Sequence, residues 1–348
     1  MRELLTYVLT IQHPENVHFF RHAIEELERE GHDVHVFCKD VRIIRQLLDH
    51  YGIEYEALAG KGGGPFTIAK AQALWEARLL VRAARIRPDV MTGAGGGTAV
   101  SHVAPLVGAD SVVFTETEHA ASHTISLPFA DEVWTPECFH RRVPTRHITY
   151  PGYQKLAYLH PNRFEPDSKA VEAAGIDPNE RYAVLRLSAW DALHDVGQAG
   201  LEDHHDVVRR IESTETRAIV IAETAVEADL EPYCVEIEPH QIHDLLAFAD
   251  VYVGEGASMA IESAVLGTPA VYVNTLRTGP TDEIEARYGL LFNCQGAYRH
   301  HNAVETAVGI LSGEITRDWH RRREQLLSET CDPTEVILTA LRGRSAQS

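Results

Sequence analysis

Residues 250–273, DVYVGEGASMAIESAVLGTPAVYV, constrain the fold more than any other part of the chain. The β-branched and aromatic start predicts a strand, and the glycines at 254–256 predict a sharp turn. A mostly apolar helix follows, with Ser258 expected as its N-cap, and Gly267 and Pro269 end it before a second strand. A helix that begins beyond the carboxyl end of a parallel strand directs free N–H groups into a crevice. Phosphate is the usual anion bound there.

Glu262 adds a second polar group to this stretch. It follows Ser258 by one helical turn, on the same side of the helix. A carboxylate there can accept hydrogen bonds from sugar hydroxyls, as the acidic residue of dinucleotide-binding folds does. The alternative is an ordinary crossover helix with Glu262 in a surface ion pair. The spacing alone leaves both interpretations open.

Strand and helix patterns alternate along the rest of the chain, which predicts parallel sheets with helices on both faces. The pattern holds to residue 149, breaks in a proline-containing stretch, and resumes at residue 182, with residues 234–237 among the expected strands. We therefore expect two domains. Their limits are 1–155 for the first, 156–180 for a linker, 181–328 for the second, and 329–348 for a terminal helix that can return to the first.

Composition narrows the class of protein. The chain carries 51 acidic against 32 basic residues, a formal net charge of −19, and its few positive charges are mostly arginine. This excess indicates a salt-rich cytoplasm (a halophilic protein) or simply an acidic soluble protein, and it disfavours nucleic-acid binding. The five cysteines are widely spaced without a CxxC pair, so we expect a reducing cytoplasm and no zinc or disulfide framework. We see no signal peptide or membrane span, and peripheral membrane contact stays open.

The motif at Gly256, Ser258, Glu262 and residues 267–269 resembles the donor-binding element of GT-B glycosyltransferases. It is most similar to that of the enzyme that adds N-acetylglucosamine to the lipid-linked peptidoglycan precursor, and the non-hydrolysing UDP-N-acetylglucosamine 2-epimerases share it. The resemblance implies an α/β fold of GT-B architecture, with two doubly wound Rossmann-like domains whose parallel sheets face each other across a cleft. It also implies a diphosphate at residues 256–259, a ribose on Glu262, and neither a metal nor another cofactor.

The resemblance extends further, to one prokaryotic family of GT-B-like proteins of unknown function. It rests on residues 18–20 (HFF), 118–120 (EHA), 186–195 and 266–269. It covers nearly the whole chain and determines the fold better than the reaction.

Polar residues at other strand ends supply further candidates. Residues 13–18, HPENVH, follow the first strand where the peptidoglycan enzyme has a glycine-rich loop with a histidine, although the glycines are missing here. Residues 115–119, TETEH, follow a later strand. Histidine and carboxylate can act as bases, or can cap and pack helices. Arg186 and Ser188 can bind phosphate. The resemblance implies that the backbone at Ile242 contacts the nucleobase.

The candidate residues fall into two groups. Catalytic candidates are His18, Glu118 and His119. Substrate-binding candidates are His13, Asn16, Arg186, Ser188, His194, Ile242, Gly256, Ala257, Ser258, Met259 and Glu262. The glycine cluster at 93–97 lacks the P-loop lysine, so ATP or NAD binding is disfavoured. Residues 202–206, EDHHD, could suggest a metal site, but we expect a capped helix start there.

These features predict a metal-independent glycosyltransferase. It would move a hexosyl or N-acetylhexosaminyl group from a nucleoside-diphosphate sugar, expected to be UDP-linked, to a glycan or lipid-linked acceptor. The setting would be surface-polysaccharide or glycoprotein glycan assembly at the inner face of the cell membrane. The alternatives are a UDP-N-acetylhexosamine 2-epimerase and a non-catalytic nucleotide-sugar-binding protein. The sugar, the acceptor, the stereochemistry and the oligomeric state stay open.

Overall fold

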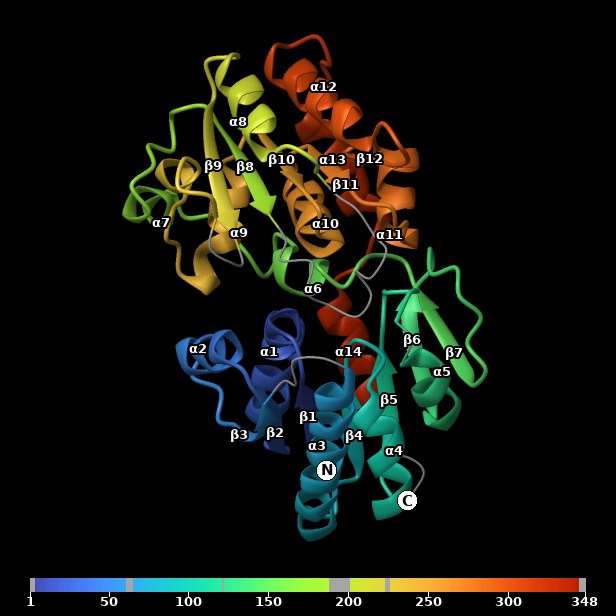
Figure 1. Cartoon of the computed structure of the whole chain (residues 1–348). Coiled ribbons are helices and arrows are strands. Elements are labelled where there is room, and N and C mark those ends of the chain that lie inside the picture. The colour runs from blue at the N-terminus through green and yellow to red at the C-terminus, as the bar shows by residue number, and fades with distance from the viewer. Residues whose placement is uncertain (1–3, 61–64, 121, 188–200, 223–225, 344–348) are drawn as a thin grey trace. The chain divides into compact units, whose positions relative to one another are not determined.

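The computed structural model describes residues 4–60, 65–120, 122–187, 201–222 and 226–343, which form two compact units (Figure 1). The first unit comprises Met1–Tyr158 and Cys331–Ser348, and the second comprises Leu159–Thr330. The C-terminal helix therefore belongs to the first unit, although the whole second unit separates it from that unit in sequence.

The first unit is built on a parallel sheet of seven strands in the order β3-β2-β1-β4-β5-β6-β7. The strands are β1 (Thr6–Ile11), β2 (Asp33–Asp40), β3 (Glu56–Gly60), β4 (Val90–Gly93), β5 (Asp110–Phe114), β6 (Glu132–Pro136) and β7 (Arg146–Tyr150). The helices are α1 (Pro14–Arg29), α2 (Arg42–His50), α3 (Pro65–Ile86), α4 (Thr98–Val107), α5 (His123–Ser126), the 3₁₀ turn η1 (Leu127–Phe129), α6 (Leu156–Leu159) at the unit boundary, and α14 (Pro333–Arg342).

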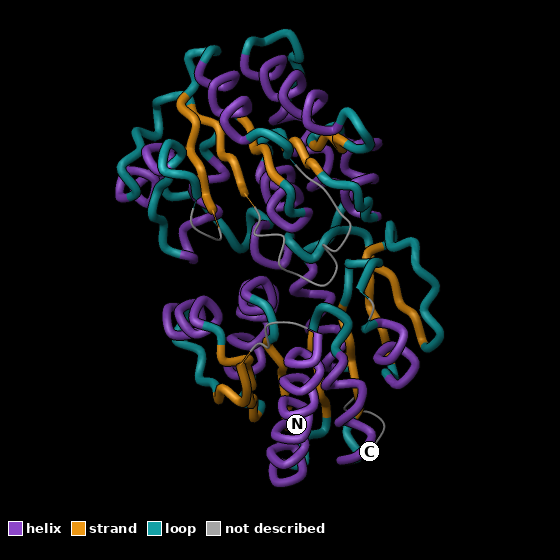
Figure 2. The backbone as a smooth tube through the Cα atoms, viewed as in Figure 1, coloured by secondary structure: helices purple, strands orange, loops and turns teal. Residues whose placement is uncertain are grey.

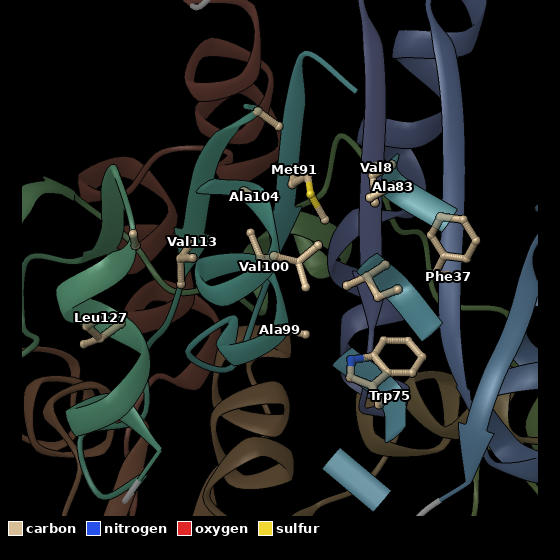
Figure 3. Close-up of a cluster of buried hydrophobic side chains, with 14 of the residues drawn as sticks. Val8, Phe37, Trp75, Ala83, Met91, Ala99, Val100, Ala104, Val113 and Leu127 are labelled. Atoms are coloured by element: carbon tan, nitrogen blue, oxygen red, sulfur yellow. The ribbon is translucent and has the colours of Figure 1, made fainter. Parts of the chain in front are cut away.

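Helices cover both faces of this sheet, so the central strands are apolar on both sides. On one face Val8, Met91 and Val113, from three different strands, pack with Trp75 of α3 and Val100 of α4 (Figure 3). Trp75 is fully buried in this cluster.

On the opposite face, Phe19 and Phe20 of α1 meet Phe114 of β5 edge-on. Helix α14 packs beside α1, and Arg342 forms an ion pair of 2.6 Å with Glu30 at the end of α1. The C-terminal helix thus completes the cover of this face.

The second unit has a five-stranded parallel sheet in the order β12-β11-β10-β8-β9. Its strands are β8 (Tyr182–Leu187), β9 (Arg217–Ala222), β10 (Val251–Gly254), β11 (Ala270–Val273) and β12 (Leu291–Cys294). Its helices are α7 (Ser168–Ala173), α8 (His204–Glu212), η2 (Glu231–Tyr233), η3 (Pro239–Gln241), α9 (Ile242–Ala247), α10 (Ala257–Leu266), α11 (Gly279–Glu283), the π-helical η4 (Ile284–Tyr288), α12 (Arg299–Leu311) and α13 (Trp319–Glu329).

Helices also flank both faces of the second sheet (Figure 2). Val251 and Val253 of β10 pack in a core with residues of α8 and α12. Tyr252 lies on the other side of the strand, as the two-residue period requires, and α9 and α10 pack against each other there. Both units are doubly wound and parallel, which confirms the predicted fold class.

Two local predictions are wrong. Residues 234–237 do not form a strand: Cys234 makes one bridge to Val220 at the sheet edge, and the segment alternates between exposed and half-buried positions. Glu236 and Glu238 are exposed in this segment, and charged residues oppose a longer ladder at a sheet edge. Ser258 is not the N-cap of α10, because the helix begins at Ala257 and Gly256 is the cap.

Candidate functional site

The carboxyl ends of β8 and β10 form the topological switch point of the second unit. From β8 the chain crosses to β9 on one side, and it enters β10 on the other side. Open α/β sheets bind their ligands at such a point. Arg186 of β8 and Gly254 of β10 are register partners there, so a half-buried arginine stands directly beside the glycine-bearing turn.

The two glycines of this turn have different surroundings. A Cβ on Gly254 would lie 2.2 Å from the Tyr252 hydroxyl and 2.9 Å from the Arg186 Cβ, so packing within the protein requires a glycine there. A Cβ on Gly256 would meet no heavy atom of the described residues within 4 Å. The backbone at Gly256 (φ −94, ψ 121) is open to any residue. Nothing in the described packing therefore explains Gly256.

Helix α10 begins at this open position. Among the described residues no side chain caps it, and its first turn contains no acidic residue. Its first N–H groups have no partner within the helix, and they carry the positive end of the helix dipole. The nearby carboxylate of Glu255 is buried and accepts a hydrogen bond of 2.8 Å from the Leu201 N–H. Ala257, Ser258 and Met259 are half-buried at this N-terminus, which can bind an anion.

Glu262 lies one turn along α10 and is only 7% exposed. Its Oε1 is 3.4 Å from Nε2 of His243 on α9, which is 3% exposed. The ring of Phe164 meets the His243 ring edge-on, with 6.2 Å between centroids. Glu262 is therefore not in a solvated surface ion pair, the alternative that the sequence left open. Its partner is a buried imidazole.

The structure describes some of the other residues that the sequence predicted for a site in the second unit. Ile242 is half-buried and begins α9, directly after the 3₁₀ turn η3. Ser188 and His194 lie outside the described residues. His243 was not among the residues predicted from the sequence, although it directly follows Ile242.

In the first unit, His13 and Asn16 cap α1. The His13 side chain accepts from the Glu15 N–H at 3.4 Å, and Asn16 Oδ1 accepts from the His13 N–H at 3.1 Å. His18 is 5% exposed. Its ring packs against Tyr51 and Tyr158, and its Nδ1 lies 3.3 Å from the Tyr51 hydroxyl. These contacts favour the capping and packing roles that the sequence also allowed.

Glu118 and His119 lie in the turn after β5. Glu118 is half-buried, and its Oε1 accepts from the His140 N–H at 3.4 Å. Its carbonyl oxygen accepts from Arg141 at 3.0 Å. His119 is exposed. Of the three catalytic candidates, His119 is the most accessible to a substrate.

A buried ionic cluster that the sequence did not reveal lies at the same end of the first sheet. Lys155 is 1% exposed and contacts the carboxylates of Glu15, in the first turn of α1, and Glu116, directly after β5. Glu116 Oε2 also accepts from the Gln154 N–H at 2.9 Å. Burial raises the pKa of Glu116, Lys155 opposes that rise, and Glu15 adds to it. The cluster joins three segments that are distant in sequence.

Two further polar groups are buried in these segments. The Tyr150 hydroxyl and the Gln154 Nε2 have no hydrogen-bond partner among the described residues. Burial raises the pKa of Tyr150, and the charge of Glu116 adds to the effect. The carboxyl end of the first sheet thus gathers several buried ionisable and polar groups.

Comparison with known proteins supports the expected relationship. The model of a family described as "Protein of unknown function (DUF354)" matches residues 6–163. No curated protein matches the chain. Among solved structures, a Listeria monocytogenes protein proposed to be a UDP-N-acetylglucosamine 2-epimerase is 12% identical, with a TM-score of 0.71 over 99% of this chain and 98% of the other.

Two other solved structures extend the comparison. The spinosyn forosaminyltransferase is 12% identical, with a TM-score of 0.67 over 99% of this chain and 100% of its own. The UDP-N-acetylglucosamine 2-epimerase of Methanocaldococcus jannaschii, solved with UDP-N-acetylglucosamine and UDP, is 12% identical, with a TM-score of 0.60 over 93% and 99%. The chain has the GT-B fold. The resemblance stated from the sequence is confirmed, and at these identities it establishes the fold alone.

The glycine cluster at residues 93–97 allows close packing of neighbouring side chains. A Cβ on Gly93 would lie 2.4 Å from Thr10 Oγ1, and one on Gly96 would lie 2.5 Å from Cδ2 of His123. Gly96 also has a φ of +88, a conformation that favours glycine. Burial and then Arg141 lower the pKa of His123 to about 4, so its imidazole is neutral at pH 7. The cluster lets a neutral histidine pack against the loop.

The acidic stretch at 202–206 begins α8, as expected. Asp203 caps the helix and accepts from the Asp206 N–H at 2.9 Å. His205, Glu227 and Asp229 gather beside it on the surface. Each ring nitrogen of His205 faces a different carboxylate, at 2.7 Å and 3.5 Å, so the imidazole bridges the two acids in this structure.

A cavity of about 330 Å³ lies at the other end of the second sheet. Asp250, Thr268 and Pro269, which precede or adjoin the amino ends of β10 and β11, line it together with Arg181 and Trp319. GT-B sheets, like other open α/β sheets, bind ligands at the carboxyl ends. We therefore assign the candidate site to Arg186, the 254–256 turn and α10, and not to this cavity.

Proposed function

We propose that the protein is a glycosyltransferase that uses a nucleoside-diphosphate sugar as its donor. The observation that carries the proposal is the N-terminus of α10. It lacks a side-chain cap among the described residues, follows an open glycine, and has the buried carboxylate of Glu262 one turn away. A diphosphate at the helix start and a ribose at Glu262 match these two features.

The charges of this site suit the departure of a nucleoside diphosphate. As the glycosidic bond breaks, negative charge develops on the leaving phosphate oxygen, and the sugar gains oxocarbenium character. The N–H groups of Ala257, Ser258 and Met259 would stabilise that charge, together with the guanidinium of Arg186. These groups are fixed by the turn and the strand, so little reorganisation accompanies the reaction.

The first unit would bind the acceptor and supply the base. His119 is exposed, and Glu118 lies beside it in the same turn, so an acceptor hydroxyl could transfer its proton to one of them. The acceptor would be a glycan or a lipid-linked sugar. No described helix is long and apolar enough to span a bilayer. We propose that a lipid-linked acceptor would be met at the inner face of the cell membrane.

A nucleotide-sugar 2-epimerase is the second candidate. The proteins named as 2-epimerases among the structural neighbours favour it, with TM-scores up to 0.71. Such an enzyme would keep the α10 site and need no acceptor. Incubation with UDP-N-acetylglucosamine alone separates the two activities, because an epimerase converts the sugar without a second substrate.

Calorimetric titration at high salt tests the donor site. UDP, UDP-N-acetylglucosamine, GDP-mannose and NAD are titrated into wild type, Glu262→Ala, and the control Glu314→Ala, an exposed glutamate of the same unit. We expect one nucleotide sugar to bind, and Glu262→Ala to weaken it at least tenfold, about 1.4 kcal/mol. Glu314→Ala should bind like wild type. Absence of binding to folded wild type would refute the proposal.

A further inference from the structure

We propose that His243 is a positioning residue that orients Glu262 toward the ribose hydroxyls of the donor. The inference rests on the proposed donor site and adds a specificity-determining side chain to it. It starts from one juxtaposition: a buried imidazole on α9 faces a buried carboxylate on α10, with Nε2 and Oε1 3.4 Å apart.

The position of His243 is fixed by its own helix. Helix α9 is anchored to the rest of the unit through Tyr182, whose hydroxyl donates to the Leu245 carbonyl at 2.7 Å, and through Thr268, whose hydroxyl donates to the Leu246 carbonyl at 2.8 Å. The edge-on contact with Phe164 sets the plane of the imidazole ring. The imidazole therefore presents Nε2 to Glu262 from a rigid support.

The contact uses one carboxylate oxygen of Glu262. At 3.4 Å it has ion-pair length, longer than a normal hydrogen bond, and unliganded sites often tighten such contacts when substrate binds. With Oε1 held by His243, the carboxylate of Glu262 has a fixed orientation, in which it can accept from a vicinal pair of hydroxyls. A ribose 2′-hydroxyl is such a donor, and a 2′-deoxyribose lacks it. The pair should therefore determine how strongly the site distinguishes ribose from deoxyribose.

The alternative is a purely structural link between α9 and α10. Such a link would contribute to folding, but it would not change the preference for one sugar over the other. The ratio of the Kd of 2′-deoxy-UDP to the Kd of UDP separates the two roles, because a general loss of stability or affinity cancels in this ratio. If the titration panel identifies guanine as the base, GDP and 2′-deoxy-GDP replace this pair of probes.

Three substitutions test the contact. His243→Phe keeps a ring against Phe164 and removes the nitrogen. His243→Gln carries an amide nitrogen close to the position of Nε2. His243→Asn is shorter, and its amide does not reach Glu262. We expect wild type and His243→Gln to prefer UDP by about tenfold, which corresponds to about 1.4 kcal/mol. His243→Phe and His243→Asn should lose most of this preference, as Glu262→Gln should.

The outcomes keep the inference separate from the proposed function. If wild type binds no nucleotide, the donor site fails, and His243 has nothing to orient. If wild type binds UDP and the ratio is the same in all three His243 variants, the donor site stands and the positioning role is refuted. Thermal unfolding of each variant checks that it is folded. Should His243→Phe fail to fold, the comparison of His243→Asn with His243→Gln gives the same answer.

Discussion

Replacing the buried Lys155 by Met should destabilise the first unit more than any other single change we consider. The methionine keeps most of the apolar stem and removes the ammonium, which leaves Glu15 and Glu116 without their shared cation. Glu116 is 5% exposed, so water cannot replace the ammonium there. The side chain of Glu15 is 15% exposed, so water can partly solvate its carboxylate after the ammonium is removed.

Two opposing electrostatic effects determine how much stability the first unit should lose. At an effective dielectric constant of about 20, an opposite charge near 4 Å is worth about 4 kcal/mol, and Lys155 contacts two carboxylates. Removing the ammonium also removes its own desolvation penalty, which amounts to several kcal/mol. The net loss should be about 3–5 kcal/mol, the range found when one partner of a buried pair is deleted. Because domains are stable by about 5–15 kcal/mol, a large part of the margin would disappear.

The pH dependence gives a second signature. Burial already raises the pKa of Glu116, and loss of Lys155 removes the group that opposes this rise. A carboxyl with a higher pKa in the folded than in the unfolded state stabilises the protein below its unfolded pKa. That contribution is lost as the pH rises through the folded pKa. The deficit of Lys155→Met should therefore shrink when the pH is lowered from about 7 to about 5.

Hydrogen exchange under increasing urea measures this effect unit by unit. Peptides from α1 and β5 should lose protection in Lys155→Met, while peptides from α10 should not. Lys70→Met, at an exposed lysine of the same unit, is the matched control. The double variant Lys155→Met/Glu116→Gln should recover much of the loss, since it removes the buried uncompensated charge. A loss below about 1 kcal/mol, or one that is independent of pH, would contradict the reasoning.

Two other predictions use the glycine turn and the buried histidine. Gly256→Ala should leave the free energy of unfolding within about 1 kcal/mol of wild type and weaken nucleotide binding, whereas Gly254→Ala should destabilise the second unit. Equal effects of the two substitutions on unfolding, measured by urea titration, would contradict this distinction. The pKa of His123 is lowered to about 4, so below pH 6.5 its imidazole binds a proton in the unfolded state and stays neutral in the folded state. The stability that the neutral His123 contributes is therefore present above pH 6.5 and is lost as the pH falls toward 4. Wild type should therefore lose about 2 kcal/mol more than His123→Gln between pH 7 and pH 5, measured by urea unfolding, and equal losses would show that His123 does not titrate in this way.

The sequence predicted the fold well because local patterns of apolar residues and turn residues determine the order of strands and helices. Buried strands and amphipathic helices alternate, and residues 250–273 contain strand, turn, helix and strand in the order observed. The prediction failed at residues 234–237, which are mostly apolar but form a single bridge, to Val220, among the described residues. Whether a strand pairs depends on the sheet edge beside it, and no local pattern reports that edge.

The candidate site was predictable only in part, for a similar reason. Glu262 could be found because it shares a helix with the turn. His243 and Glu262 belong to different helices, and Lys155 is 140 residues from Glu15 and 39 from Glu116. Lys155 also lies in the stretch after residue 149 where the periodic pattern breaks, so nothing in its neighbourhood predicts burial. Such contacts form only when distant segments come together in the folded chain, and no pattern within one segment predicts them.

Helix α10 lacks a side-chain cap at a position where the backbone and the open space would accept one. Side chains cap α1, α7, α8, α11, α13 and α14, and each such cap is worth about 1 kcal/mol. At Gly256 a serine or aspartate would fit the backbone and the open space, and would add a cap of the same kind. Helices α2, α4, α9 and α12 also lack a side-chain cap among the described residues, and α10 is the uncapped helix that begins at the switch point of the second sheet. Departures from a local rule of this kind concentrate at functional sites, because a cap would occupy the N–H groups that a diphosphate needs.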